Sequence, residues 1–337
     1  MKKYLLSNKN CYKANLHCHS TISDGKFTPE QLKALYKQEG YSILAYTDHE
    51  ILVPHTELTD ENFLALTGYE VQIYGDMHLP KRLRRVCHIN FIAKEATHNK
   101  MPFFNMADVM RLDKTPDISK AVYDGDGDDY KEYSANGIND LIKKAKDNGF
   151  IVSYNHPTWS KEDSSIYTNL EGLFAMEIYN TGAEKLGNSE YNSALYDLLL
   201  KKGKRLCCVA ADDNHNFSDE TSPYCDSFGG FVMINANALT HKAVFSALEN
   251  REFYSSTGPI INELYVENGY VFIKCSEAKK IRMHTHNRYS AVAIAEDKPL
   301  TEACFKLAAT TEYFRIEVTD HSGEKAYTNA YFLDELK

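Results

Sequence analysis

Several features that mark well-known protein classes are missing from this chain of 337 residues. It contains a single tryptophan, and none of its eight cysteines are spaced as C-x-x-C. Eight cysteines without that spacing and without a secretory leader fit reduced, mostly buried thiols better than a disulfide framework. The sequence also contains no G-x-S-x-G motif and no P-loop. It therefore gives no support to acyl-serine chemistry or to chemistry driven by nucleoside triphosphates.

Long hydrophobic runs are also scarce. The first ten residues, MKKYLLSNKN, contain one apolar run, from Tyr4 to Leu6, which is too short for the hydrophobic region of a signal peptide. No later stretch approaches the roughly 20 apolar residues that span a membrane. We therefore expect a cytoplasmic protein with no membrane partner.

Positive charge is in the minority, since the formal net charge is −9 at pH 7. Binding to nucleic acid without sequence preference depends on clustered Lys and Arg, so a long nucleic acid is not an expected partner. One local exception is KRLRR at residues 81–85, which we interpret as a solvated charge run rather than a phosphate-binding patch. Nothing in the sequence indicates an oligomeric state.

Short apolar runs alternate with helical patterns in the first two thirds of the chain. Strands are predicted at residues 14–18, 42–47, 63–69, 87–92, 150–155, 173–179 and 205–211. Helices are predicted from the Thr28 cap to Gly40 and at residues 138–148, 189–202 and 240–250. Because strands that alternate with helices usually pair in parallel, this region indicates an α/β fold with a parallel sheet.

Two segments depart from this alternation. Residues 99–136 include the acidic stretch YDGDGDDYKEY, which resembles a calcium loop, but Asp129 stands where that loop requires glycine. A mobile surface insertion is the preferred interpretation. From residue 259 to 337 short alternating strands such as ELYVE and YFRIEV predict a small antiparallel, β-sandwich-like domain.

Polar side chains gather where the predicted strands end. The set contains six of the 13 histidines and three carboxylates: His17, His19, Asp24, His49, Glu70, His88, His156, Asp213 and His215. The carboxyl ends of strands in a parallel β/α barrel converge on one face, so these side chains have reason to meet. Nine nitrogen and oxygen donors without a thiolate would suit two or three divalent ions such as Zn, Mn or Fe(II).

The order of these motifs resembles the PHP (polymerase and histidinol phosphatase) superfamily of metallohydrolases. The matching motifs are H-x-H at 17–19, S-D-G at 23–25, T-D-H at 47–49, a following Glu, a His, N-H-P at 155–157 and D-x-H at 213–215. The N-L-H-x-H-S start and the later S-S-T-G-P resemble the CehA/McbA-like branch most closely. The resemblance covers about residues 14–259.

The resemblance implies a TIM-like (β/α)7 barrel over residues 1–258 and up to three metal ions. One ion would be held by His17, His19 and Asp213, with Glu70 bridging to a second ion on His88 and His156. A third ion would be held by Asp24, His49 and His215. Asp24 stands where many relatives have histidine, which should weaken or re-tune that third site, and His78 competes with His88 for its place. Asp48 is expected to orient a ligand imidazole.

The resemblance also implies a reaction. Divalent ions lower the pKa of a bound water and stabilise both oxygens of an in-line displacement, which suits hydrolysis of a phosphate ester. Glu70, Asp213 and His215 are the candidate catalytic residues, with the proton assigned to either Asp213 or His215. The expected substrate is a small phosphorylated metabolite, a nucleotide or a short oligonucleotide end.

Two other functions remain open. The first is hydrolysis of a carbamate, ester or amide, and the second is a non-enzymatic metal-binding regulatory module. A phosphate would need cationic partners besides the metals, with Arg82, Arg84, Arg85 and Arg111 as candidates, whereas a neutral carbonyl would need an apolar wall. Trp159 is a candidate for that wall, with packing in the core as the equal alternative.

Overall fold

The computed structural model describes residues 2–7, 9–112, 114 and 116–336. Its strands are β1 (Lys3–Ser7), β2 (Cys11–Asn15), β3 (Ile43–Tyr46), β4 (Leu64–Tyr74), β5 (Val86–Ala93), β6 (Phe150–Tyr154), β7 (Ala175–Asn180), β8 (Cys207–Ala211), β9 (Phe231–Asn235), β10 (Phe253–Ser256), β11 (Ile261–Glu267), β12 (Tyr270–Ala278), β13 (Lys280–Thr285), β14 (Ala291–Ile294), β15 (Leu300–Lys306), β16 (Tyr313–Thr319), β17 (Lys325–Thr328) and β18 (Tyr331–Phe332). The α-helices are α1 (Pro29–Gln38), α2 (Met106–Val109), α3 (Ala135–Asp147), α4 (Pro157–Ser160), α5 (Ser164–Tyr167), α6 (Thr181–Lys185), α7 (Ser193–Lys201) and α8 (His241–Glu249).

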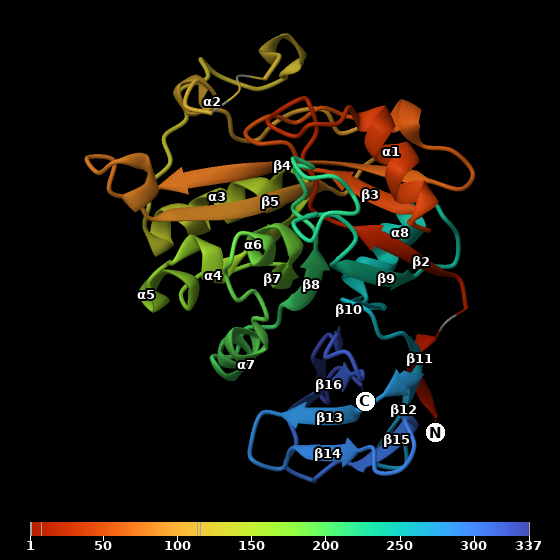
Figure 1. The fold of residues 1–337 in the computed structure, drawn as a ribbon. Coiled ribbons are helices and arrows are strands. Elements are labelled where there is room, and N and C mark those ends of the chain that lie inside the picture. The colour runs from red at the N-terminus through yellow and green to blue at the C-terminus, as the bar shows by residue number, and fades with distance from the viewer. Residues whose placement is uncertain (1, 8, 113, 115, 337) are drawn as a thin grey trace.

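One large mixed sheet forms the body of the molecule (Figure 1). Along it the strands follow the order β14-β13-β16-β17-β10-β9-β2-β3-β4-β5-β6-β7-β8. The pairs β2–β3, β3–β4, β6–β7 and β7–β8 are parallel, as the alternation with helices predicts. The chain is therefore an α/β protein.

The expectation of uniform parallel pairing is wrong at β5. This strand runs antiparallel to both neighbours, β4 and β6. The reason lies in the connection, because the segment from Gly75 to Arg85 contains no α-helix that could carry the chain back for a parallel crossover. The reversal places the beginning of β5, rather than its end, beside the end of β4.

The sheet is also not closed into the expected TIM-like barrel. In the described part of the chain, β8 pairs along its length only with β7. Beyond β8 a single parallel bridge joins Cys18 to Asn214. The backbone N–H of Asp213 donates to the carbonyl of His17 at 2.9 Å, and that of His19 donates to Asn214 at 3.2 Å. The loops after β2 and β8 are thus held together at one rim, although no ladder closes the sheet.

Local sequence signals account for many of the elements. The predicted capping box is present at α1, where the Thr28 hydroxyl accepts from the backbone N–H of Gln31 and the Gln31 side chain accepts from that of Thr28. Five of the predicted strands coincide closely with β3 and β5 to β8, and β4 continues to Tyr74, five residues beyond its predicted end. Strand β2 begins and ends about three residues earlier than predicted.

The interpretation of residues 99–136 as a mobile surface insertion needs correction. Met101, Phe103, Phe104 and Val109 are buried in the largest hydrophobic core, together with residues of β4, β5 and α3. Most of the acidic stretch remains at the surface, but Lys131 within it is buried. The insertion is therefore anchored by its first half and by Lys131.

The C-terminal strands are antiparallel, as predicted. A separate four-stranded sheet has the order β1-β11-β12-β15, so the N-terminal strand completes it. Figure 1 shows these strands at one end of the molecule, near both termini, with α2 at the opposite end. The turn-rich segment near residue 253 forms β10, which pairs with β9 and β17 and makes the main sheet continuous with the C-terminal strands. A domain boundary at residue 258 remains a prediction.

Candidate metal centre

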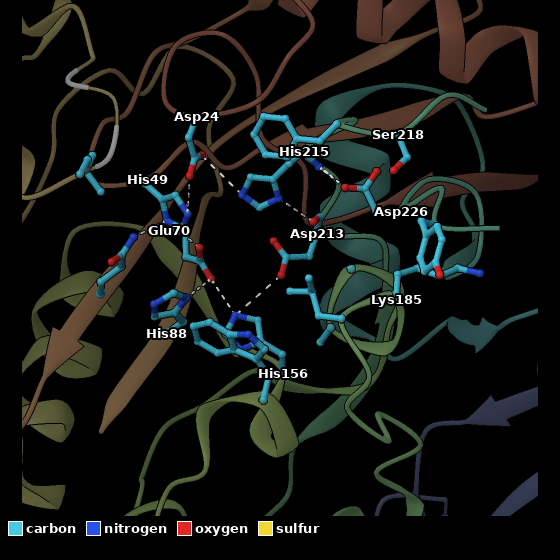
Figure 2. A pocket seen from close by; sticks show the side chains of 18 of the residues that line it. Asp24, His49, Glu70, His88, His156, Lys185, Asp213, His215, Ser218 and Asp226 are labelled. Carbon is cyan, nitrogen blue, oxygen red and sulfur yellow. Dashed lines mark hydrogen bonds and ion pairs between the residues drawn. The ribbon is translucent and has the colours of Figure 1, made fainter. Parts of the chain in front are cut away.

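The side chains of the nine predicted site residues meet at one rim of the sheet. His17, His19 and Asp24 follow β2, His49 follows β3, Glu70 lies in β4, His88 lies in β5, His156 follows β6, and Asp213 and His215 follow β8. Figure 2 labels seven of them, with His49, His88 and His156 arranged around Glu70 and with Asp24, Asp213 and His215 nearby. Because β5 is reversed, His88 reaches the rim from the start of its strand, opposite Gln72 of β4.

These residues form three overlapping groups with metal-ligand geometry. In each group one ligand atom per residue lies within 4.8 Å of all the others. The groups are His17, His19, Glu70 and Asp213; Glu70, His88 and His156; and His19, Asp24, His49 and His215. Glu70 belongs to the first two groups and His19 to the first and third, so neighbouring groups share a side chain. His88 belongs to the second group, and His78 belongs to none of the three.

Glu70 is the central residue of the cluster. Its Oε1 lies 3.3 Å from His17 Nε2, 3.1 Å from His88 Nδ1 and 3.3 Å from His156 Nε2. Its Oε2 lies 2.8 Å from His49 Nδ1. The carboxylate is fully buried, and burial alone would raise its pKa, but the surrounding imidazoles outweigh burial and hold the pKa well below its usual range.

Asp213 lies beside the two histidines of the H-x-H motif. Its Oδ1 is 3.1 Å from His17 Nε2 and 2.9 Å from His19 Nε2, and those two ring nitrogens are 3.1 Å apart. The backbone of Asp213 has a φ of 53° and that of His156 a φ of 25°, both in the left-handed region. Strained backbone of this kind is held by its surroundings and is concentrated at functional sites.

The third group is the most open of the three. Asp24 Oδ2 lies 3.7 Å from His49 Nε2, and Asp24 Oδ1 lies 3.5 Å from His215 Nε2. Burial would lower the pKa of His215, but the Asp24 carboxylate raises it to about 9. The carboxylate of Asp226 accepts the backbone N–H of His215 at 2.8 Å, which fixes the loop after β8.

The donor set fits divalent metal ions. His19 Nδ1 and His88 Nε2 are buried ring nitrogens that find no hydrogen-bond partner in the described part of the chain. Burial of unpaired polar atoms is costly, and several imidazole nitrogens converge here on shared carboxylates. Imidazole and carboxylate donors without thiolate suit Zn, Mn and Fe(II). The residues present are thus those that such ions require.

A further carboxylate, missed by the sequence reasoning, orients this cluster. Glu177 Oε1 in β7 lies 2.7 Å from His17 Nδ1, and Glu177 Oε2 accepts the backbone N–H of His156 at 2.7 Å. With a proton on Nδ1, the His17 ring leaves the lone pair of Nε2 for the cluster. An acidic residue inside the otherwise apolar strand LFAMEIY was the available signal.

Asp48 does not have the orienting role that was expected of it. Its carboxylate accepts from the backbone N–H and hydroxyl groups of Ser20 and Ser23 and contacts no ligand imidazole.

A cavity of about 500 Å³ opens over the cluster. Lys81 and Lys185 contribute positive charge to its lining, while Leu112, Trp159, Leu186 and Phe217 form an apolar wall. None of the four candidate arginines lines it. Arg85 pairs with Asp76 and Arg111 with Asp108, each a residue close to it in sequence. The expectation that arginines supply the cationic partners is therefore wrong, and lysines occupy that position.

Comparison with known proteins finds distant structural neighbours. No family model and no curated protein matches the chain. A two-domain protein of Bacteroides vulgatus containing a predicted PHP-like metal-dependent phosphoesterase is 16% identical, with a TM-score of 0.44 and coverage of 95% of each chain. A Bifidobacterium adolescentis protein named as a metal-dependent phosphoesterase is 14% identical, with a TM-score of 0.39 over 62% of this chain and 90% of that one. An amidohydrolase of Chromobacterium violaceum is 16% identical, with a TM-score of 0.38 over 63% of this chain and 93% of that one.

These identities and TM-scores are too low to transfer a function to this chain. A functional assignment must therefore be argued from the side chains of the site.

Among the described residues, the helices are all too short or too polar to cross a membrane.

Proposed function

We propose that the chain is a metal-dependent phosphoesterase of the PHP superfamily that acts on a small phosphorylated substrate. The observation that supports this most strongly is the sharing of Glu70 and His19 between three groups of metal-ligand geometry. Sharing of ligands brings ions close together, and closely spaced divalent ions recur in enzymes that hydrolyse phosphate esters.

Each predicted site residue has a place in the proposed centre. His17, His19 and Asp213 would hold one ion, His88 and His156 a second, and Asp24, His49 and His215 a third, with Glu70 shared between the first two. Two or three ions of Zn, Mn or Fe would supply Lewis acidity toward water and the phosphoryl oxygens. Glu177 holds the His17 ring in orientation.

Proton transfer is assigned to the open side of the centre. His215 lines the cavity beside Asp24 and Asp226, and its Nδ1 lies 3.0 Å from the backbone carbonyl of Asp213. With two ions bound and the third group vacant, a histidine so placed could hold a proton for a leaving alcohol on its Nε2, whereas a third ion would take that nitrogen instead. Asp213, whose Oδ1 contacts both His17 and His19, is better suited to holding an ion than to exchanging a proton.

The substrate class follows from the size and lining of the cavity. About 500 Å³ accommodates a phosphorylated metabolite, a nucleotide or a short oligonucleotide end. Lys81 and Lys185 would attract its negative charge. The net charge of −9 continues to oppose a long nucleic acid.

A second candidate function is hydrolysis of a carbamate, ester or amide. It is favoured by the apolar wall of Leu112, Trp159, Leu186 and Phe217, which would suit a neutral carbonyl substrate. A non-enzymatic metal-binding module is the third candidate.

The test is turnover of a mixed substrate panel. Protein loaded with Mn(II) is assayed on phosphomonoesters, phosphodiesters and an aryl carbamate, together with Asp213→Ala. The expected result is phosphoester turnover that falls at least about 100-fold in the variant, because the variant lacks the Asp213 carboxylate that would bind an ion together with His17 and His19. Asp219→Ala, which changes an exposed carboxylate in the same loop, is the matched control and should retain full activity.

The other outcomes separate the candidates. Turnover of the carbamate alone would replace the phosphoesterase by a carbonyl hydrolase. No turnover of any substrate by metal-replete protein would favour the non-enzymatic module.

A further inference from the structure

One buried lysine of the insertion reaches the edge of the metal centre. Lys131 is only 9% exposed, and its ammonium lies 2.6 Å from both carboxylate oxygens of Glu50 and 2.9 Å from Asp108 Oδ2. The same ammonium donates to the backbone carbonyl of Gln72 at 2.9 Å. A buried lysine with partners on every side is fixed in position, unlike the exposed lysines around it.

Lys131 and Glu50 provide hydrogen bonds to the end of β4, where β3 no longer pairs with it. Strand β3 ends at Tyr46, and the last bridge to β4 joins His49 to Glu70. Beyond that bridge, the backbone N–H of Gln72 donates to Glu50 Oε1 at 2.7 Å, and its carbonyl accepts from Lys131. Both backbone groups of Gln72 are therefore satisfied by side chains.

The position of Gln72 determines the orientation of the His49 ring. The amide nitrogen of the Gln72 side chain lies 2.7 Å from His49 Nδ1, and the other amide atom accepts from the Tyr74 hydroxyl. Glu50 directly follows His49, has a φ of 60°, and donates its backbone N–H to the Glu70 carbonyl at 2.8 Å. Because Nδ1 faces Gln72 and Glu70, the ring turns Nε2 toward Asp24.

We propose that Lys131 is a positioning residue for the third metal group, acting on His49 through Glu50 and Gln72. The insertion at residues 99–136 is then a part of the metal centre. The inference rests on the proposed metal centre, but it does not depend on the reaction that the centre catalyses.

The experiment measures metal binding directly. Wild type and Lys131→Met are loaded with Zn²⁺, dialysed and analysed for bound metal by mass spectrometry, and Co²⁺ absorption reports the ligand field. In folded Lys131→Met we expect one class of site to lose affinity about 10- to 100-fold, as removal of supporting partners does in other metal centres. The remaining ions should bind as in the wild type.

Two further variants separate positioning from loss of fold. Gln72→Met removes the contact to His49 without leaving a buried charge, and it should weaken the same class of site. Lys144→Met breaks the ion pair that joins α3 to Asp129 of the insertion at 3.0 Å but leaves the contacts of Glu50 in place, and it should bind metal normally.

Three outcomes overturn this inference alone, and a fourth overturns it together with the proposed metal centre. Wild-type metal binding in folded Lys131→Met would do so, and so would wild-type binding in Gln72→Met if Lys131→Met does not fold. An equal loss in Lys144→Met would show that any loosening of the insertion has the same effect. If the wild type binds no metal at all, the proposed metal centre fails together with this inference.

Discussion

Glu177 illustrates how a single residue outside the ligand set can determine the properties of the centre. It is buried in β7 and contacts His17 Nδ1, the His156 backbone N–H and the amide of Asn180. A histidine has two ring nitrogens, and the partner of one determines what the other can do. Glu177 therefore determines which nitrogen of His17 faces the other ligands.

We predict that Glu177→Gln lowers metal affinity about 10- to 100-fold while the protein stays folded. An amide still fills the space but is a weaker acceptor for the His17 Nδ1 proton, so the preferred tautomer is less strongly enforced. The measurement is competition of the protein with a chromophoric chelator for Zn²⁺. Glu162→Gln is the control, since Glu162 is also largely buried but contacts Tyr154 rather than a predicted ligand.

An unchanged Zn²⁺ affinity in Glu177→Gln would contradict the orienting role. A loss of similar size in Glu162→Gln would instead point to a general effect of removing a buried carboxylate.

For single residues, the sequence predicts the metal-ligand candidates far better than the residues that orient them. His17, His19, His49 and His156 stand in short motifs whose residues lie together in the chain. Glu177 and Lys131 are brought to the cluster only by tertiary structure, from segments that carry no motif. KRLRR was interpreted as a solvated charge run, and its arginines, named only as candidate partners of a phosphate, lie outside the cavity lining.

Among the elements, α7 and the C-terminal strands are joined by a contact that contains buried charge. Arg315 of β16 is fully buried, and its guanidinium donates to Asp197 of α7 at 2.7 and 2.8 Å. Glu317 of β16 lies nearby, 3.6 Å from His284 Nε2. Burial would raise the pKa of Glu317, but His284 and Arg315 lower it to about 2, and His284 and Arg315 likewise hold the pKa of Asp197 below its usual range.

These depressed pKa values predict the direction of an acid effect. The unfolded chain binds protons on Asp197 and Glu317 near pH 4, whereas the folded chain binds them only at lower pH. Their contribution to stability is therefore complete above about pH 5 and is lost as the pH falls toward 2.

We predict that Arg315→Met lowers the free energy of unfolding at pH 7 by about 3 kcal/mol, because it leaves Asp197 without its buried partner. The difference between wild type and variant should shrink as the pH falls from 6 to 3, and urea unfolding at each pH measures it. Arg282→Met is the control: this arginine is 36% exposed and 3.4 Å from Glu317, so its loss should cost less than about 1 kcal/mol. A difference that is constant with pH would contradict the assignment.

The elements also show where sequence patterns lose information. Helix α1 and strands β3 to β8 follow from caps and apolar runs, whose causes are local. The direction of β5 and the joining of β9 to β10 depend on pairing between distant segments, which an apolar run does not encode. The closed barrel was expected from the resemblance, and it fails between β8 and β2, where a single bridge from Cys18 to Asn214 takes the place of a ladder in the described chain.

The whole molecule has a sheet that runs without interruption across residue 258. Strand β10 pairs with β17, and Tyr313, Tyr327 and Phe332 belong to the same hydrophobic core as β4, β5 and α3. The C-terminal strands thus contribute to burying the body that carries the metal centre.

We predict that residues 1–258 alone do not give a soluble, metal-binding protein. Removal of the three aromatic residues from the core would each cost about 3 to 5 kcal/mol, which together exceeds the stability of a typical domain. The measurement is the soluble yield and Zn²⁺ content of the truncated chain, with co-expression of residues 259–337 as the control for rescue. A truncated chain that is soluble and binds Zn²⁺ like the full chain would instead establish the boundary at 258 as one between independent domains.

Strand β1 has a consequence for how the molecule is made. Its partner in the sheet is β11, so Lys3 lies opposite Val266. A ribosome that adds about 5 to 20 residues per second reaches that partner roughly 10 to 50 s after the first strand has emerged. During synthesis the N-terminal strand must therefore wait, unpaired and exposed, while the rest of the sheet forms, and it is the segment on which a chaperone has the longest time to act.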